Sequence, residues 1–428
     1  MRSLTLAALA AVALVVDGRA VAQDAAPAGA QPAEPSQQAP QSPQSPEERQ
    51  RLEEQIAKEL GASPGATPTP PAPPDLSAPP PSPSTAQGQQ GGNPFARLLL
   101  LPDISAIGDF AAAYDSRDAA VESPRSGPVS QPHQLRPLFQ ELELGIQSVV
   151  DPYARADAFI SFTPDGVSVE EAYLTTLQLP AGLQARAGKL FSPFGRLNQQ
   201  HPHVWDFVDA PLALDRLVSA DQLKGPGLDV AWLAPVPWFL EAHLYGQTTT
   251  PAFEDKERRT VGGRVLQYFD LTDAVVAGLG LSAARLEEPA SGAWRDLGGV
   301  DVHVKIRPPQ GRSYLALQGE LFWRRLTDPV APAQADVGGY AQAVWRDGPY
   351  FAYGARYDFA PAFQDSRGGI VQVDGTEHRA SAVAAWLPSE FQRLRLQAGW
   401  DFLPGGREGL ELLLQLEFAI GAHGAHPF

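Results

Sequence analysis

The stretch GGVDVHVKIRP, residues 298–308, alternates strictly between apolar and charged side chains. Valine or isoleucine occupies every second position, and aspartate, histidine, lysine and arginine stand between them. Because successive side chains of a β-strand point to opposite faces, this pattern predicts a strand with one apolar and one charged face. A soluble sandwich would bury the apolar face in its core. A membrane barrel would instead turn it toward lipid and enclose the charged face in a wet lumen.

The same alternation recurs along the chain from residue 103 onward. It is clear in 142–147, 154–162, 238–247, 392–402 and 410–418, and sixteen such segments of roughly ten residues can be assigned. An even number of strands is what single-chain bacterial barrels require. We therefore predict an all-β protein, a sixteen-stranded antiparallel transmembrane β-barrel over residues 103–428.

The connections between these segments also favour a barrel. If the amino terminus lies in the periplasm, the turns after even-numbered strands are short and rich in turn residues. The connections after odd-numbered strands are generally longer, and they are 115–136, 192–225, 249–259, 284–296, 326–335 and 360–375. Short periplasmic turns and long external loops are typical of outer-membrane barrels, whereas a sandwich gives no reason for lengths to alternate.

Tryptophans are placed at the ends of the predicted strands. Six of the eight share the parity of the apolar face, and these are Trp232, Trp238, Trp323, Trp345, Trp386 and Trp400. Amphipathic rings at both rims of the apolar band form the girdle that faces the two membrane interfaces. We predict that these six residues contact outer-membrane lipid at the interfaces.

The first hundred residues differ in kind from the rest. Residues 1–22 combine Arg2, a short apolar run and an Ala-Val-Ala site, which predicts a secretory signal peptide. Residues 23–102 are rich in proline and glutamine and predict a disordered periplasmic arm. Within it, 46–60 predicts a short helix, either transient or a small oligomerisation coil.

Composition excludes several classes of function. The chain has no cysteine, so disulfides and lipoprotein acylation are excluded, and its formal net charge of -16 argues against nucleic acid as a partner. No G-x-S-x-G, HExxH or phosphate-loop signature occurs. We predict no enzymatic activity and no cofactor.

The parity that faces the lumen carries most of the charged side chains of the strands. Rings of opposite charge across a pore would bias which solutes pass. Together with charged residues of the long connection 192–225, the predicted pore-lining and constriction set comprises Arg155, Asp157, Arg186, Arg196, Asp206, Asp209, Glu241, His243, Asp301, His303, Lys305, Arg307, Glu320, Arg356, Arg393 and Arg395. Mutual pairing that keeps a wet wall soluble is the alternative interpretation for any one of them.

Two histidines in the same connection suggest a metal. His201 and His203 are separated by one residue, so on an extended segment their rings face the same way, and Asp206 and Asp209 follow closely. Imidazole and carboxylate ligands suit a borderline metal such as zinc. A histidine pair in a loop can also be incidental.

These features together resemble the bacterial outer-membrane porin superfamily. Within it, VEEAYL (169–174) followed by ARAGKLFSPFG (185–195) resembles the phosphate-selective porin-like branch. The resemblance implies a passive diffusion channel, often a homotrimer, in which loop 192–225 folds inward as the constriction. It also implies that Phe428 is read by the outer-membrane assembly machinery. The loop carries both signs of charge and does not plainly reproduce the basic constriction of phosphate-selecting members.

The sequence thus predicts an outer-membrane porin for small hydrophilic solutes or ions. Two alternatives stay open. One is a metal- or ligand-selective uptake channel, and the other is a structural outer-membrane anchor without transport.

Overall fold

The computed structural model describes residues 102–421 except 118–132, 252–256, 290, 309–310, 331 and 367–368. The predicted signal peptide, the short helix at 46–60 and Phe428 lie outside the described residues, as does all but the last residue of the arm. Within the described part of the chain, no helix has the length and apolar character needed to cross a membrane.

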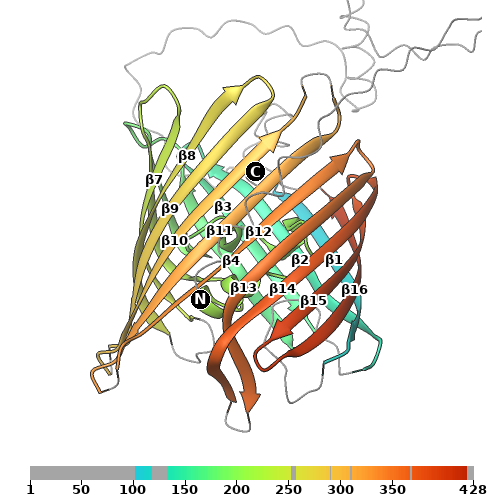
Figure 1. Ribbon diagram of the computed structural model, residues 1–428. Helices are drawn as coiled ribbons and strands as arrows, with labels where there is room; N and C mark the ends of the chain where they lie inside the picture. Colours follow the sequence, from blue (N-terminus) through green and yellow to red (C-terminus); the bar gives the residue numbers. More distant parts are fainter. Residues whose placement is uncertain are drawn as a thin grey trace, which may run out of the picture. The chain divides into compact units, whose positions relative to one another are not determined.

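Sixteen antiparallel strands close into a barrel, as the sequence predicts (Figure 1). Each strand pairs with its neighbours in the sequence, and β1 closes the ring by pairing with β16 from Ser105↔Gly421 to Asp115↔Glu411. The strands are β1 Asp103–Asp115, β2 Arg136–Asp151, β3 Ala154–Thr163, β4 Gly166–Thr176, β5 Leu183–Phe191, β6 Lys224–Leu233, β7 Phe239–Thr249, β8 Arg258–Thr272, β9 Val275–Glu287, β10 Trp294–Ile306, β11 Tyr314–Thr327, β12 Gln334–Asp347, β13 Phe351–Ser366, β14 Gly369–Ser389, β15 Gln392–Leu403 and β16 Arg407–Gly421.

Most charged side chains of the strands point into the barrel. In β10, Asp301 is 3% exposed, whereas Val300 and Val302 on the opposite face are 41% and 44% exposed. The same inversion holds around the ring, where most exposed large side chains of the strands are leucine, valine or aromatic. Exposure of so many apolar side chains to water is unfavourable, so this outer surface is suited to the hydrocarbon interior of a membrane.

Hairpins at the two ends of the barrel differ in length. The hairpins after β2, β8, β12 and β14 use two or three residues each, and those after β4, β6 and β10 use 177–182, 234–238 and 307–313. We call this rim the turn end and the opposite rim the loop end. At the loop end, the segment 360–375 is not the loop that the sequence suggests. It extends β13 and β14 into a long hairpin, with Ser366 paired to Gly369.

The connection from β5 to β6, residues 192–223, lies inside the barrel (Figure 1). This β5–β6 loop contains two 3-10 turns, η2 Leu197–Gln199 and η3 Pro202–Val204, and one π-helical turn, η4 Leu214–Val218. Its apolar side chains form the main hydrophobic core with inward-facing residues of β7 and β9–β13. The wall residues of this core are Tyr245, Ala284, Leu286, Leu297, Phe322, Tyr340 and Ala360.

Candidate functional site

Arginines of the barrel wall bind backbone carbonyls of the β5–β6 loop. Arg395 on β15 donates from Nη1 to the carbonyl oxygens of Trp205 and Phe207, at 2.5 and 3.0 Å. Arg393 on the same strand also donates to Trp205, at 3.2 Å. A loop buried inside a barrel needs partners for its carbonyls, and these guanidinium groups supply them.

Asp209 joins this loop to three strands. Its Oδ1 accepts hydrogen bonds from Arg356 Nη2 and Gln397 Nε2, both at 2.7 Å, and its Oδ2 lies 3.0 Å from Arg379 Nη2. Arg356 also donates to the Asp209 carbonyl oxygen, at 2.9 Å. The carboxylate is buried, and its contacts with these strands hold the loop against the wall.

Glu320 on β11 accepts hydrogen bonds from the start of the loop. Its carboxylate accepts hydrogen bonds from the backbone N–H groups of Arg196 and Leu197, at 2.7 and 2.9 Å, and from the Tyr340 hydroxyl at 2.7 Å. Gly195 approaches so closely that a Cβ there would lie 2.4 Å from Glu320 Oε2, and its φ of 64° also favours glycine.

A buried ion pair fixes the far part of the loop. Arg216 in η4 lies 2.8 Å from Glu377 on β14, and both side chains are fully buried. Arg324 on β11 donates to the Arg216 carbonyl oxygen at 2.9 Å. The loop is therefore held by charged contacts along the wall formed by β11 and β13–β15.

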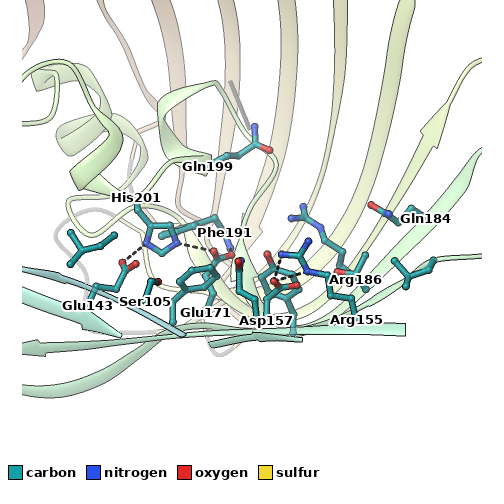
Figure 2. A pocket seen from close by; sticks show the side chains of 16 residues that line it. Ser105, Glu143, Arg155, Asp157, Glu171, Gln184, Arg186, Phe191, Gln199 and His201 are labelled. Carbon is teal, nitrogen blue, oxygen red and sulfur yellow. Dashed lines mark hydrogen bonds and ion pairs between the residues drawn. The ribbon is translucent and has the colours of Figure 1, made fainter. Parts of the chain in front are cut away.

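On the opposite side of the lumen, a cavity of ≈ 350 Å³ remains between the loop and the strands β1–β5 (Figure 2). Its lining carries both signs of charge, with Glu143, Asp157 and Glu171 against Arg155 and Arg186. Arg155 is paired with Asp157 at 2.6 Å, and Arg186 is paired with Asp229 at 2.8 Å. Figure 2 shows both arginines beside this cavity.

His201 forms the loop's contact with this wall. Its Nδ1 lies 2.8 Å from Glu143 Oε2, and its Nε2 lies 3.1 Å from Glu171 Oε2. Burial alone would lower the pKa of His201, but hydrogen bonds and charge interactions with both carboxylates raise it to about 10. His201 therefore bridges Glu143 of β2 and Glu171 of β4.

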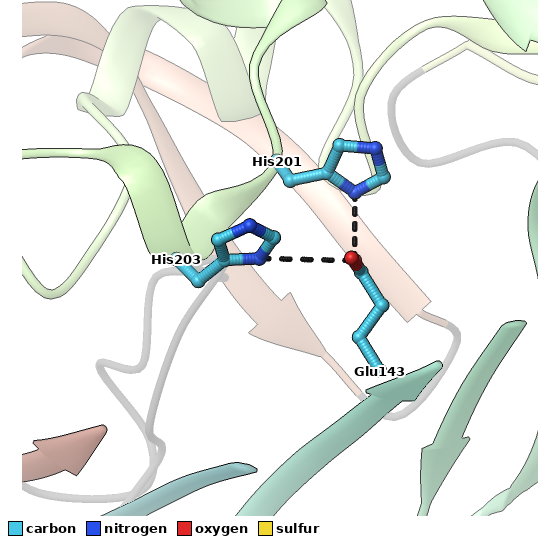
Figure 3. Close-up of side chains that lie close together, drawn as sticks. All are labelled: Glu143, His201 and His203. Atoms are coloured by element: carbon cyan, nitrogen blue, oxygen red, sulfur yellow. Dashed lines mark ion pairs between the residues drawn. The ribbon is translucent and has the colours of Figure 1, made fainter. Parts of the chain in front are cut away.

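His203 completes this cluster (Figure 3). Its Nδ1 lies 3.7 Å from the same Glu143 oxygen, and its ring stacks on that of His201 with centroids 5.5 Å apart. The two histidines and Glu143 are buried and form a possible metal-binding group. Asp206 and Asp209, which the sequence placed near the histidines, are not part of this group.

The remaining predicted lumen residues lie elsewhere on the wall. Asp301 pairs with Arg264 at 2.8 Å, and Asp229 lies 3.1 Å from His243, which in turn lies 3.6 Å from Glu241. A second group lies toward the turn end of the barrel. Lys305 and Arg307 lie over the Tyr314 ring, at 4.6 and 5.0 Å from its centroid. His303 precedes them on the inner face of β10.

Two residues of the β5–β6 loop contact other parts of the wall. Arg196 donates to the Tyr268 hydroxyl at 2.9 Å. Asp206 stays exposed in the lumen and accepts from Gln342 at 3.3 Å.

Several residues of the site were not singled out from the sequence. Glu143, Glu171, Asp229 and Arg264 all point inward and hold histidines or charges of the predicted set. The parity of β2 would have found Glu143, which alternates with Leu142 and Leu144. In β4 the pairing with β3 shifts register opposite Phe159/Ile160. The alternation of the sequence therefore does not tell which of Glu170 and Glu171 faces the lumen.

The six predicted girdle tryptophans lie on the outer face. Their exposed fractions are all between 41% and 48%, for Trp232, Trp238, Trp323, Trp345, Trp386 and Trp400. Trp238 also donates from its ring nitrogen to Gln267, at 3.3 Å.

A closed sixteen-stranded barrel with a loop folded into its lumen is the fold of the outer-membrane porins. Among solved structures, the chain is similar to OprB of Pseudomonas putida (TM-score 0.53, 11% identity, 74% of this chain and 94% of that one). It is also similar to an anion-selective porin from Comamonas acidovorans (TM-score 0.52, 12% identity, 74% and 99%) and to the outer membrane channel DcaP of Acinetobacter baumannii (TM-score 0.51, 11% identity, 74% and 97%). At these identities the similarity concerns the fold.

A comparison by sequence identifies the family. The chain belongs to the same family as an uncharacterized protein of Aquifex aeolicus (strain VF5), with 32% identity over 385 residues, covering 78% of this chain and 82% of the relative. No protein-family model matches the chain.

Proposed function

We propose that this protein is an outer-membrane porin, a passive diffusion channel for small hydrophilic solutes or ions. The observation that carries the proposal is the polar cavity that remains between the β5–β6 loop and the strands β1–β5, inside a barrel whose outer face is apolar. A hydrated path through an apolar-coated cylinder is what diffusion across a membrane requires. The predicted arm, residues 23–102, would then lie in the periplasm.

The β5–β6 loop is proposed as the constriction. Its apolar side chains fill the lumen against β7 and β9–β13, so solutes are left with the side lined by β1–β5. Residues Arg155, Asp157 and Arg186 from the wall and Gln199 from the loop line that passage. The predicted set also includes Arg356, Arg393 and Arg395, which in this arrangement support the loop.

We propose weak ion selectivity for this channel. The cavity holds carboxylates and guanidinium groups in similar number, and its two arginines are already paired with aspartates. The arginines of β13–β15 are likewise occupied by Asp209, Glu417 and loop carbonyls. This arrangement does not favour phosphate over other anions, in contrast to the resemblance to the phosphate-selective porin-like branch.

Conductance in a planar lipid bilayer tests the channel. Purified full-length mature protein should produce stepwise conductance increases, with small differences between cation and anion permeability in a salt gradient. A bilayer that stays electrically silent while the protein is folded would instead support a structural outer-membrane anchor.

Assembly is part of the same proposal. We propose a homotrimer inserted by the outer-membrane assembly machinery through Phe428. Chemical cross-linking in detergent should give a trimer band, and removal of Phe428 should reduce the amount of barrel in the outer membrane.

A second candidate function is a metal-selective uptake channel. It is favoured by the imidazole pair beside the cavity, because His201 lines the passage that a solute would use.

A further inference from the structure

Two histidines and a glutamate meet where the β5–β6 loop contacts β2. The ligand atoms that they offer all lie within 4.8 Å of one another. Glu143 Oε2 lies 2.8 Å from His201 Nδ1 and 3.7 Å from His203 Nδ1. Ligands bound to zinc at about 2.0–2.1 Å lie roughly 3.3–3.4 Å from one another in a tetrahedral site. The two separations from Glu143 Oε2, 2.8 and 3.7 Å, fall on either side of that value.

The contact between His201 Nε2 and Glu171 is of the kind that a metal-bound histidine makes through its second ring nitrogen. Its Nε2 lies 3.1 Å from Glu171 Oε2, which leaves Nδ1 to face Glu143. A metal-bound histidine commonly donates its second ring N–H to a carboxylate, which fixes its tautomer and orientation. Glu171 is placed to accept that hydrogen bond when Nδ1 binds a metal.

The site also borders the cavity. Glu143 and His201 both line the cavity (Figure 2), so an ion in the lumen can approach them. Glu143 Oε2 is buried and lies between the rings of His201 and His203. A buried carboxylate needs compensation for its charge, and a cation bound there would supply it.

We propose that Glu143, His201 and His203 bind a borderline divalent cation such as Zn²⁺, with Glu171 orienting His201. The donor set of two imidazole nitrogens and one carboxylate oxygen suits zinc. The bound ion joins the β5–β6 loop to β2 and so fixes the edge of the proposed passage.

The inference uses the cavity of the proposed channel, but binding is measured without conduction, so the two proposals can fail separately. Full-length mature protein in detergent is freed of metal with a chelator and titrated with Zn²⁺, with bound metal counted by atomic emission. Wild type should bind about one Zn²⁺ per chain. His203→Ala and Glu143→Gln should each lower the affinity at least tenfold, and Glu171→Gln should lower it by about 10–100-fold.

Two controls separate this site from other histidines. His243 also lies between two carboxylates but has no second imidazole beside it among the described residues, so His243→Ala should retain the wild-type stoichiometry. The double variant His423→Ala/His426→Ala removes the histidines near the carboxyl end and should also retain it. A shift in gel mobility between heated and unheated samples confirms that each variant is a folded barrel. Glu143→Gln keeps the shape of the side chain and so still tests the site if an alanine variant does not fold.

Three results would overturn the proposal. The first is the absence of zinc binding to folded wild type, and the second is unchanged affinity in both His203→Ala and Glu143→Gln. The third is loss of the bound ion in the carboxyl-end variant alone, which would assign zinc to His423 and His426.

Discussion

The Asp209 carboxylate contacts side chains from β13, β14 and β15, namely Arg356, Arg379 and Gln397. Replacing Asp209 by asparagine keeps the shape but removes the charge that the two buried guanidinium groups face. Breaking a buried ion pair from one side costs about 3–5 kcal/mol. We expect Asp209→Asn to release the β5–β6 loop, seen as faster proteolysis within residues 192–223 and as noisier channel current.

Asp221→Asn is the matched control for this prediction. Asp221 lies in the same loop and pairs with Lys224 at 2.8 Å, but its side chain is 85% exposed. An exposed pair contributes about 0–1 kcal/mol, so proteolysis should stay near the wild-type rate. Equal sensitivity of the two variants would show that Asp209 does not hold the loop.

Arg155 is the more exposed of the two arginines in the cavity, with 44% of its side chain accessible. Arg155→Gln leaves Asp157 without its partner and makes the passage more negative. We expect the reversal potential in a salt gradient to shift toward cation preference. Arg285→Gln, which changes a charge on the outer side of β9, should leave the reversal potential unchanged. A shift in both variants, or in neither, would remove Arg155 from the passage.

Parity predicted which charged residues face inward, but not what each one contacts. Arg155, Asp157 and Arg356 all lie inside, yet the first two line the cavity and the third is covered by the loop. That difference depends on where the loop packs, and the alternation within a strand carries no information about it. Glu143 was predictable as an inward residue, but its meeting with His201 depends on a contact across 58 positions of the chain.

The β5–β6 loop is the element that sets the shape of the lumen. Leu217 in η4 is fully buried in the core that the loop shares with the wall. An aspartate there would place an unpaired charge in an apolar contact, which is strongly unfavourable. We expect Leu217→Asp to undock this part of the loop and to raise the unit conductance in planar bilayers.

Leu217→Met tests whether the effect comes from polarity. Methionine conserves most of the volume and usually costs less than 1.5 kcal/mol in a core, so conductance should stay at the wild-type value. If Leu217→Asp also conducts like wild type while folded, the loop does not narrow the channel.

The strands were the most predictable elements, because each has its own alternating pattern. The exception was the hairpin of β13 and β14, where the pairing shifts register between Pro361 and Phe363. A bulge reverses which parity faces inward, so the alternation is interrupted although the strand continues. The inner fold of the β5–β6 loop had no such pattern, since its apolar residues pack on a wall from distant strands.

At the scale of the whole molecule, the outer surface determines whether the protein stays dissolved in water or needs detergent or lipid. Large apolar side chains such as Leu244 and Val261 are exposed on the outside, while the ion pairs lie inside. We expect mature protein to remain in solution only with detergent or lipid. Analytical ultracentrifugation and circular dichroism without detergent provide the measurement, and a compact, β-rich monomer there would contradict the membrane assignment.

The pairing of β1 with β16 has a consequence for biogenesis. Ser105 pairs with Gly421, so the ring cannot close until residue 421 has been synthesised. Until then the first strand presents an unsatisfied edge, and such edges recruit other chains. We therefore expect a chain that ends before β16 to leave β1 without its partner and to aggregate.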